Sequence, residues 1–324
     1  MFRNLFSTGL FCLKMVVYEV FSHPELRRYK THICSKASLI LVVILFLTTI
    51  APLLTVYRSY GFWLKEGFYE ETPDVKFKRQ LLVVIELENE GDFLTYSTYQ
   101  RYNQLQQQNL RVPLIQSREE DWNRDGKADG LDFRLEIPLQ DSQKVTGVKL
   151  LLFFDYKLYR YSTLTMECMA YINHDSAKAG ARYQVFGDLR ISQRQPLSHK
   201  GLDDRYNTPI LNSTSMYADD YEFSTIFKEY TARNVTTYLH APYTSWITGR
   251  GAGQPFVVSA NITYAEGRYL YHTGFWYMIK WGWVQYVSVL ILFLFVFDRI
   301  KVFIYQNQLV QTLVQTPYNK EKLQ

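Results

Sequence analysis

Two long apolar runs divide this chain into three parts. Residues 37–57 and 275–297 are almost entirely apolar, whereas the 217 residues between them mix polar with apolar positions. Helices of 21 and 23 residues are long enough to cross a hydrocarbon layer of about 30 Å. The pattern therefore predicts two transmembrane helices that flank a large polar domain, residues 58–274.

The polar domain has the hydrophobic pattern of β-strands. In residues 131–137, leucine, phenylalanine and isoleucine alternate with charged residues, which is the period of a strand with one buried face. Similar short runs, rich in β-branched and aromatic residues, occur at 81–88, 145–156, 163–172, 183–192 and 255–264. Turn-forming residues separate the runs at 89–91, 125–126 and 173–175, and residues 226–233 are the best candidate for a short helix. We therefore predict an antiparallel β-sandwich, flanked by the two transmembrane α-helices.

The distribution of charge predicts the orientation in the membrane. Residues 1–36 carry a net charge of +4 and residues 298–324 a net charge of +2, whereas residues 58–274 carry −2. Positively charged flanks are retained on the cytosolic side, so we expect both termini in the cytosol and the central domain in the lumen or outside the cell. The three N-glycosylation sequons also fall in the central domain, at Asn212, Asn234 and Asn261. We predict that at least one of them is glycosylated.

Cysteine usage narrows the possible classes of protein. The chain has three cysteines, of which only Cys168 falls in the predicted external domain. This count excludes an ectodomain stabilised by several disulfides, such as those of the two-span ATP-gated and acid-sensing channels. Cys34 precedes the first span beside Lys36, where reversible palmitoylation is one possibility and an unmodified thiol is the other.

The sequence contains no recognisable catalytic constellation. Its six histidines are scattered, and no G-x-S-x-G motif is present. We therefore predict that the protein is not an enzyme. We expect the lipid bilayer and other proteins as its partners, and neither nucleic acid nor a small-molecule substrate.

One loop has the spacing of calcium ligands. Six oxygen-bearing positions follow the order 1, 3, 5, 7, 9 and 12 of a calcium-binding loop, with Gly126 at the sharp turn of position 6. These positions are Asp121, Asn123, Asp125, the carbonyl of Lys127, Asp129 and Asp132. The alternative is an acidic turn whose side chains bond to the backbone and hold no ion. The sequence therefore predicts a weak Ca²⁺ site, with this alternative left open.

An ordered series of short motifs resembles the transmembrane protein 231 family, from about residue 16 onward. The motifs are FSHP at 21–24, CSKA at 34–37, GFWLK at 61–65, REED at 118–121, GDLR at 187–190, QPLS at 195–198, NVTT at 234–237, WVQYVS at 283–288 and DRIK at 298–301. The resemblance implies a membrane protein of the ciliary transition zone, in the complex associated with Meckel and Joubert syndromes. Its implied partners are B9-domain and tectonic-type proteins, and its implied role is a gate that restricts membrane-protein passage and supports ciliogenesis and signalling.

Two other functions fit the predicted layout less well. One is an auxiliary subunit of a membrane transporter, like the two-span β-subunits of lipid flippases, although those subunits carry lumenal disulfides. The other is a lumenal enzyme held by two spans, for which the sequence shows no catalytic residues.

Overall fold

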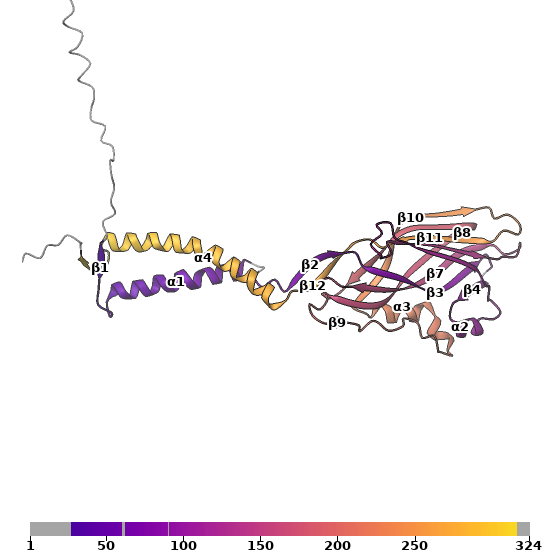
Figure 1. Cartoon of the computed structure of the whole chain (residues 1–324), viewed down its shortest axis with the longest axis horizontal. Helices are drawn as coiled ribbons and strands as arrows, with labels where there is room; N and C mark the ends of the chain where they lie inside the picture. Colours follow the sequence, from indigo (N-terminus) through magenta and orange to yellow (C-terminus); the bar gives the residue numbers. More distant parts are fainter. Residues whose placement is uncertain (1–26, 60–61, 90, 316–324) are drawn as a thin grey trace, which may run out of the picture. The chain divides into compact units, whose positions relative to one another are not determined.

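The chain folds into two compact units. The computed structural model describes residues 27–59, 62–89 and 91–315 of the 324 residues. One unit consists of Met1–Phe62 and Lys280–Gln324, and the other of Trp63–Ile279. We call the first the helical unit and the second the β domain (Figure 1).

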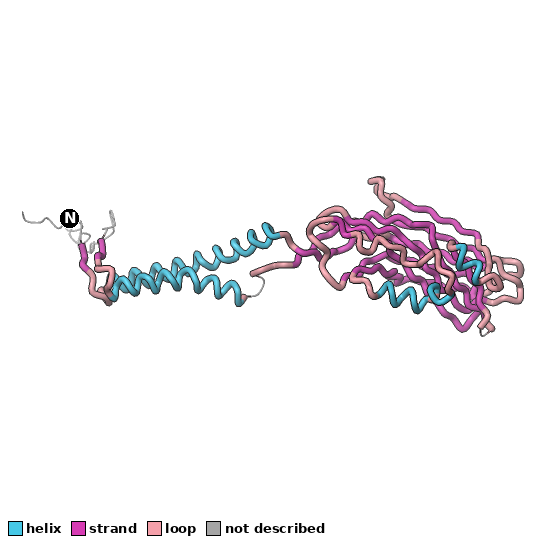
Figure 2. Tube along the Cα trace, turned by 90° about the horizontal axis from the view of Figure 1, so that it is seen from below, coloured by secondary structure: helices cyan, strands magenta, loops and turns pink. Residues whose placement is uncertain are grey.

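Two long antiparallel helices form the helical unit. Helix α1 (Lys36–Arg58) begins after Ser35, whose hydroxyl accepts a hydrogen bond from the Ser38 N–H, as an N-cap residue does. Helix α4 (Phe275–Gln306) lies beside α1 (Figure 2). The hydroxyls of Tyr305 and Tyr286 donate to the backbone carbonyls of Ala37, at the start of α1, and of Thr49, near its middle. Beyond the helices, strands β1 (Arg28–Lys30) and β13 (Leu313–Gln315) pair in antiparallel fashion.

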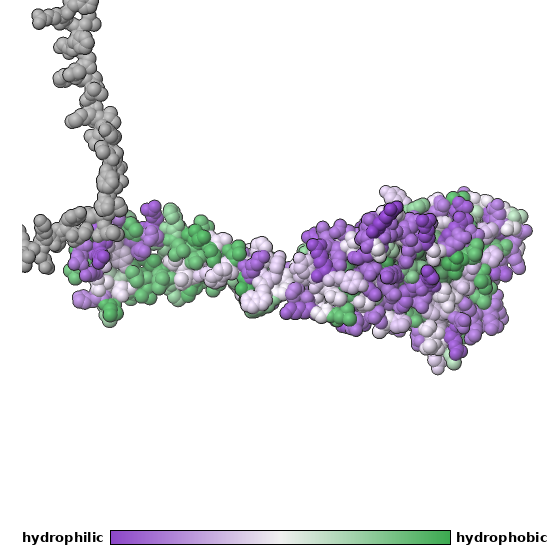
Figure 3. All heavy atoms as spheres, viewed as in Figure 1, coloured by the Kyte–Doolittle hydropathy of each residue, from purple (hydrophilic) through white to green (hydrophobic). Residues whose placement is uncertain are grey.

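The structure supports the two predicted transmembrane helices to different degrees. Among the residues that the structure describes, α1 is the one helix that is long and apolar enough to cross a membrane, and its surface is largely hydrophobic (Figure 3). The second predicted span is helical but is part of the longer helix α4, which does not pass the same test. The first half of α4 contains Lys280 and Gln285, and charged residues follow Phe297. The second crossing stays a prediction.

The β domain consists mainly of strands. They are β2 (Glu66–Glu71), β3 (Asp74–Leu87), β4 (Phe93–Ser97), β5 (Leu114–Glu120), β6 (Gly130–Ile137), β7 (Val145–Leu158), β8 (Thr163–Gln193), β9 (Leu202–Asp203), β10 (Val235–Thr248), β11 (Phe256–Thr263) and β12 (Gly267–His272). Its helical segments are α2 (Gln100–Leu105), the 3-10 helix η1 (Ala218–Tyr221) and α3 (Phe223–Thr231). The prediction of a mostly β domain is therefore confirmed.

Strand β8 connects all parts of the main sheet. The sheet has nine strands in the order β4-β3-β7-β8-β11-β6-β5, and β9 and β10 also pair with β8. The first part of β8 pairs with β7, and its later part lies between β10 and β11. The pairings of β8 with β11 and with β9 are parallel, so the sheet is not purely antiparallel as predicted. Strands β2 and β12 form a separate two-stranded ribbon.

Apolar side chains fill two layers of the β domain. The larger cluster joins β3 and β7 to β6 and β11, and the rings of Phe77 and Phe133 lie 5.9 Å apart within it. A second cluster lies on the other face of β3 and β7, where Phe153 and Leu151 pack beneath α2, η1 and α3. Because the central parts of β3 and β7 are buried on both faces, residues 81–85 and 150–154 are continuous apolar runs rather than alternating ones.

One predicted turn is wrong. Residues 173–175 carry turn-forming side chains but continue strand β8, where they pair with β7. The ring of His174 stacks on Tyr183 at 4.7 Å and lies 4.8 Å from Trp246. His174 and Tyr183 both lie on β8, whereas Trp246 lies on β10. The two strands predicted at 163–172 and 183–192 form one strand of 31 residues, whose register with β7 shifts between Asp175 and Gly180.

We expect Glu167→Ala to destabilise the β domain strongly. Glu167 is 3% exposed, accepts a hydrogen bond from Lys78 Nζ and accepts another from the Ile210 N–H at 2.9 Å. The substitution leaves both donors without this acceptor, so the free energy of unfolding should fall by about 2–3 kcal/mol. Chemical unfolding of the detergent-solubilised chain measures the loss. Asp188→Ala, which removes a surface pair with Arg190, is the control and should cost less than about 1 kcal/mol; equal losses would contradict a special role for Glu167.

Candidate functional site

A pocket of about 600 Å³ opens on the β domain beside the turn between β3 and β4. Its walls come from four separate parts of the chain: the end of β3 with the following turn, the start of β7, helix α2, and the η1–α3 segment. The second apolar cluster ends here, because the helices cover only part of the outer face of β3 and β7. The volume lies within the range of small-molecule sites.

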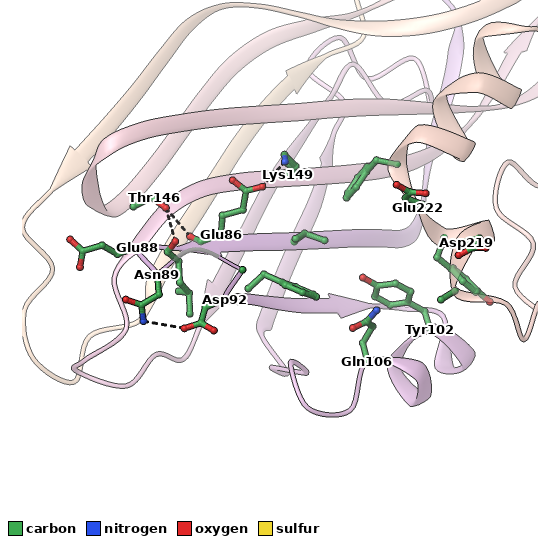
Figure 4. Close-up of a pocket in the computed structure, with 17 residues that line it drawn as sticks. Glu86, Glu88, Asn89, Asp92, Tyr102, Gln106, Thr146, Lys149, Asp219 and Glu222 are labelled. Atoms are coloured by element: carbon green, nitrogen blue, oxygen red, sulfur yellow. Dashed lines mark hydrogen bonds and ion pairs between the residues drawn. The ribbon is translucent and has the colours of Figure 1, made fainter.

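Acidic side chains dominate the lining of this pocket. Among the described residues, five carboxylates line it, and one ammonium group, that of Lys149, accompanies them. The carboxylates are those of Glu86, Glu88, Asp92, Asp219 and Glu222. Figure 4 shows Glu86, Glu88 and Asp92 on one side of the pocket and Asp219 and Glu222 on the other.

The carboxylates on the β3–β4 side have partners. Lys149 Nζ donates to Glu86 Oε1 at 2.5 Å, and this hydrogen bond is the main reason why the pKa of the Lys149 ammonium is raised. Lys144 Nζ lies 2.9 Å from Glu88 Oε2. Asp92 Oδ2 accepts a hydrogen bond from the Asn89 amide at 3.0 Å. Glu86 and Glu88 are therefore each paired with a cation, whereas Asp92 has only a neutral hydrogen-bond partner.

The carboxylates on the helical side differ. Asp219 and Glu222 are exposed, and within the described part of the chain neither forms an ion pair. Glu222 is the N-cap residue of α3, but its side chain makes no capping hydrogen bond. Of the three lining carboxylates without an ion pair in the described structure, two therefore lie at this side and the third, Asp92, lies at the other.

Aromatic rings form the floor between the two acidic sides. Tyr102 and Tyr221 both line the pocket, with ring centroids 5.3 Å apart. The Tyr102 hydroxyl bonds to the Thr95 hydroxyl at 2.8 Å, and the Tyr221 hydroxyl donates to the Ser215 carbonyl at 3.1 Å. Both rings are thus held in place by their buried hydroxyls.

The predicted calcium loop connects β5 to β6 and is held by its own hydrogen bonds. Asp129 Oδ2 accepts from the backbone N–H groups of Trp122 and Asn123, at 2.8 and 3.2 Å. Asp121 Oδ2 accepts from the Gly126 N–H at 3.0 Å. Gly126 has a φ of 86°, a conformation that glycine adopts without a steric penalty.

The remaining predicted ligands are placed differently. Asp125 Oδ1 accepts from the Lys127 N–H at 2.8 Å, as in an Asx turn. Asp132 lies outside the loop, in β6, where it is in register with Arg118 and Asn261. No group of three or more His, Cys, Asp and Glu side chains is placed to hold a metal ion in the described ranges. The hydrogen bonds fit the alternative of an acidic turn, and calcium binding stays a prediction.

All three sequons lie in the β domain. Asn212 is exposed, and its Oδ1 accepts from the Thr214 N–H and hydroxyl at 3.1 and 2.8 Å. Asn234 precedes β10 and donates from Nδ2 to Gln195 Oε1 at 3.1 Å. Asn261 is half-buried in β11. Their use by the glycosylation machinery stays a prediction.

The two described cysteines have contrasting environments. Cys168 is buried in the core, and burial is the main reason why the pKa of its thiol rises to about 12. A thiol that stays protonated is a poor nucleophile, which agrees with a packing role. Cys34 is exposed immediately before α1, and its palmitoylation stays a prediction.

Sequence reasoning did not find the acidic pocket. Its lining comes from positions between 84 and 223, and no spacing rule connects residues so far apart. The one local signal is the acidic sequence ADDYE at 218–222, which on its own resembles any solvated turn.

Comparison with known proteins gives one consistent family. The family model described as transmembrane protein 231 matches residues 15–314. Transmembrane protein 231 of Rattus norvegicus is 50% identical over 300 residues, 92% of this chain and 95% of the relative. The Homo sapiens protein of the same name is 50% identical over 303 residues, 93% of this chain and 96% of the relative. The cryo-EM structure of a proton-activated chloride channel aligns with 83% of this chain and 99% of that chain at 7% identity, but its TM-score of 0.23 is too low to support an argument.

We expect Asp129→Ala to loosen the β5–β6 hairpin. The substitution removes the acceptor for the N–H groups of Trp122 and Asn123 and should cost about 1–2 kcal/mol. Amide hydrogen exchange of β5 and β6 measures the change. Asp132→Ala, on an exposed side chain of the same hairpin, should leave exchange without calcium unchanged.

The same pair of variants tests calcium. If calcium uses the predicted ligands, millimolar CaCl₂ slows exchange of this hairpin in the unaltered chain. Both Asp129→Ala and Asp132→Ala should abolish that slowing. An identical effect in all three proteins, or none, would show that the calcium prediction is wrong.

Glycosylation tests the side of the membrane on which the β domain lies. Removal of N-glycans should increase the gel mobility of the chain expressed in animal cells. The triple substitution Asn212→Gln, Asn234→Gln and Asn261→Gln should abolish this shift. Asn207→Gln is the control, because Asn207 is followed by Thr208 and Pro209 and is not a sequon. A chain whose mobility does not respond to the glycosidase would contradict a lumenal or extracellular β domain.

Proposed function

Because this chain belongs to the transmembrane protein 231 family, we propose that it is a structural subunit of the membrane-protein complex at the ciliary transition zone. In this role it helps to form the barrier that controls the protein composition of the ciliary membrane. It thereby supports ciliogenesis and signalling through the cilium. Family membership is the observation that carries this proposal.

The extent of the similarity supports the transfer of this role. The match begins before α1 and ends after α4. It therefore includes the apolar helix, the β domain and the flanking segments, and identity near 50% extends over more than nine-tenths of the chain. A similarity confined to one unit would have supported only a shared fold.

We propose a two-span layout for this subunit. Both α1 and α4 cross the membrane, and residues 1–36 and 298–324 face the cytosol. The β domain is a sandwich on the lumenal or extracellular side. The antiparallel contact of the two helices supports this layout, because Tyr305 reaches the start of α1 and Tyr286 its middle. So does the pairing of β1 with β13, which joins the two basic flanks.

We propose that the subunit acts by binding proteins rather than by catalysis. Its partners are other transition-zone membrane proteins and proteins of the B9-domain and tectonic types. Contacts on the cytosolic side involve residues 1–36 and 298–324. On the lumenal or extracellular side, the β domain, which we expect to carry N-glycans, offers partners a much larger surface than the two flanks do.

Localisation of a C-terminally tagged chain in ciliated cells tests the proposal. We expect a ring at the base of the cilium in super-resolution images. Loss of the gene should allow membrane proteins to leak between the ciliary and plasma membranes, and the tagged chain should restore the barrier. The control is a tagged chain in which the sequence of α1 is replaced by an unrelated membrane helix of equal length.

Two outcomes would contradict the proposal. One is a uniform signal in secretory membranes with intact cilia after loss of the gene. The other is co-purification with a large membrane pump in place of transition-zone proteins, which would favour the auxiliary-subunit function.

A further inference from the structure

We propose that the acidic pocket beside the β3–β4 turn binds an elongated organic cation, a guanidinium or primary ammonium group on an aliphatic chain. Arginine and lysine side chains of a partner protein have this chemistry, and so do free aliphatic polyamines. The proposal concerns the β domain alone and does not depend on the proposed function.

The sign of the ligand's charge follows from the charges that line the pocket. Five carboxylates face one ammonium group among the described lining residues. Lys149 does not act as a free counter-ion, because it is hydrogen-bonded to Glu86. An anionic ligand would therefore meet strong repulsion, whereas a cation would be attracted.

The two ends of the pocket bind different parts of the ligand. Asp219 and Glu222 have no ion-pair partner in the described part of the chain, so the cationic group belongs at their side. At the other end, Asp92 and Asn89 are already hydrogen-bonded to each other. Asp92 has no ion-pair partner in the described residues, so this end can hold either a second cationic group or a polar group such as a peptide.

The floor of the pocket selects an organic cation over a metal ion. Phe93, Tyr102 and Phe223 line the space between the two acidic sides. Aromatic faces attract ammonium and guanidinium groups and also pack against the aliphatic chain that carries them. A divalent metal ion would instead require several converging oxygen atoms, and no group of three or more His, Cys, Asp and Glu side chains is so placed among the described residues.

A purely structural role explains the pocket less well. The aromatic rings that pack in the second apolar cluster, such as Tyr102 and Tyr221, satisfy their hydroxyls within the protein. The exposed carboxylates of Asp219 and Glu222, in contrast, make no side-chain contact that stabilises η1 or α3 in the described structure. They can therefore be neutralised without removing a hydrogen bond from the fold.

Titration of the full chain in lipid nanodiscs with agmatine, whose four-carbon chain carries a guanidinium at one end and a primary ammonium at the other, tests the proposal. Ligand-observed NMR should detect saturable binding. The double variant Asp219→Asn, Glu222→Gln should weaken this binding at least about fivefold, because it removes two charges that attract the cation. Phe223→Leu should weaken it as well, because the leucine side chain keeps the apolar contact but lacks an aromatic face.

The control variant is Glu229→Gln. It neutralises one carboxylate on α3, the helix that follows Glu222, but Glu229 does not line the pocket. It should bind agmatine like the unaltered chain. Equal unfolding temperatures of all variants will show that the fold is intact. Absence of saturable binding to the unaltered chain, or equal weakening by Glu229→Gln, would overturn the proposal.

A second titration distinguishes the two sources of the cation. A short peptide with a central arginine is compared with the same peptide carrying citrulline, which has a similar shape but no charge. Tighter binding of the arginine peptide than of agmatine supports the proposal and identifies a protein segment as the ligand. Agmatine binding at least as tightly supports it and identifies a free cation. Equal binding of the arginine and citrulline peptides would overturn it.

Discussion

The closure of the β domain at its two ends is the constraint on which its fold depends. Strands β2 and β12 are the first and last strands of the domain and pair with each other over six residues. The pairing continues beyond them, since the Thr273 N–H donates to the Lys65 carbonyl at 2.9 Å and the Thr273 hydroxyl to the Leu64 carbonyl at 2.6 Å. The domain is thus a closed insertion whose entry and exit are joined by backbone hydrogen bonds, and the cost of bringing its ends together is met within the domain itself.

A group of buried tyrosines attaches this ribbon to the main sheet. The hydroxyls of Tyr156 in β7 and Tyr269 in β12 lie 2.7 Å apart, and the rings of Tyr69 and Tyr269 lie 5.4 Å apart. Burial is the first cause of the raised pKa of Tyr69, about 12, and also raises that of Tyr156. Neither phenol ionises at physiological pH, so the attachment persists over the pH range of cellular compartments.

The sequence predicts those parts of the fold that depend on local patterns. The apolar run of α1 and the alternation of residues 131–137 each specify an element by themselves, and both are correct within one residue at each end. Strand β10 was not predicted, because Pro242 interrupts it and proline normally disfavours an interior strand position. The structure accommodates it at a shift of register between His240 and Tyr243, on a strand whose described pairing is with β8 alone. The acidic pocket was beyond prediction for another reason: its charges and rings meet only after β3, β7 and the η1–α3 segment have packed.

In the β domain, the polar groups that hold the fold together are paired with one another, whereas some charged groups at the surface have no such partner. In the described residues no disulfide crosslinks it, so its stability depends on the two apolar clusters and on buried polar links such as Glu167 with Lys78. These links are satisfied internally and leave little for a partner to contact. Asp219 and Glu222, which have no ion-pair partner in the described residues, line the pocket where the second apolar cluster meets solvent. Complementary charge orients a ligand and speeds its association, and in this domain the edge of the second apolar cluster presents unpaired carboxylates beside packed aromatic rings.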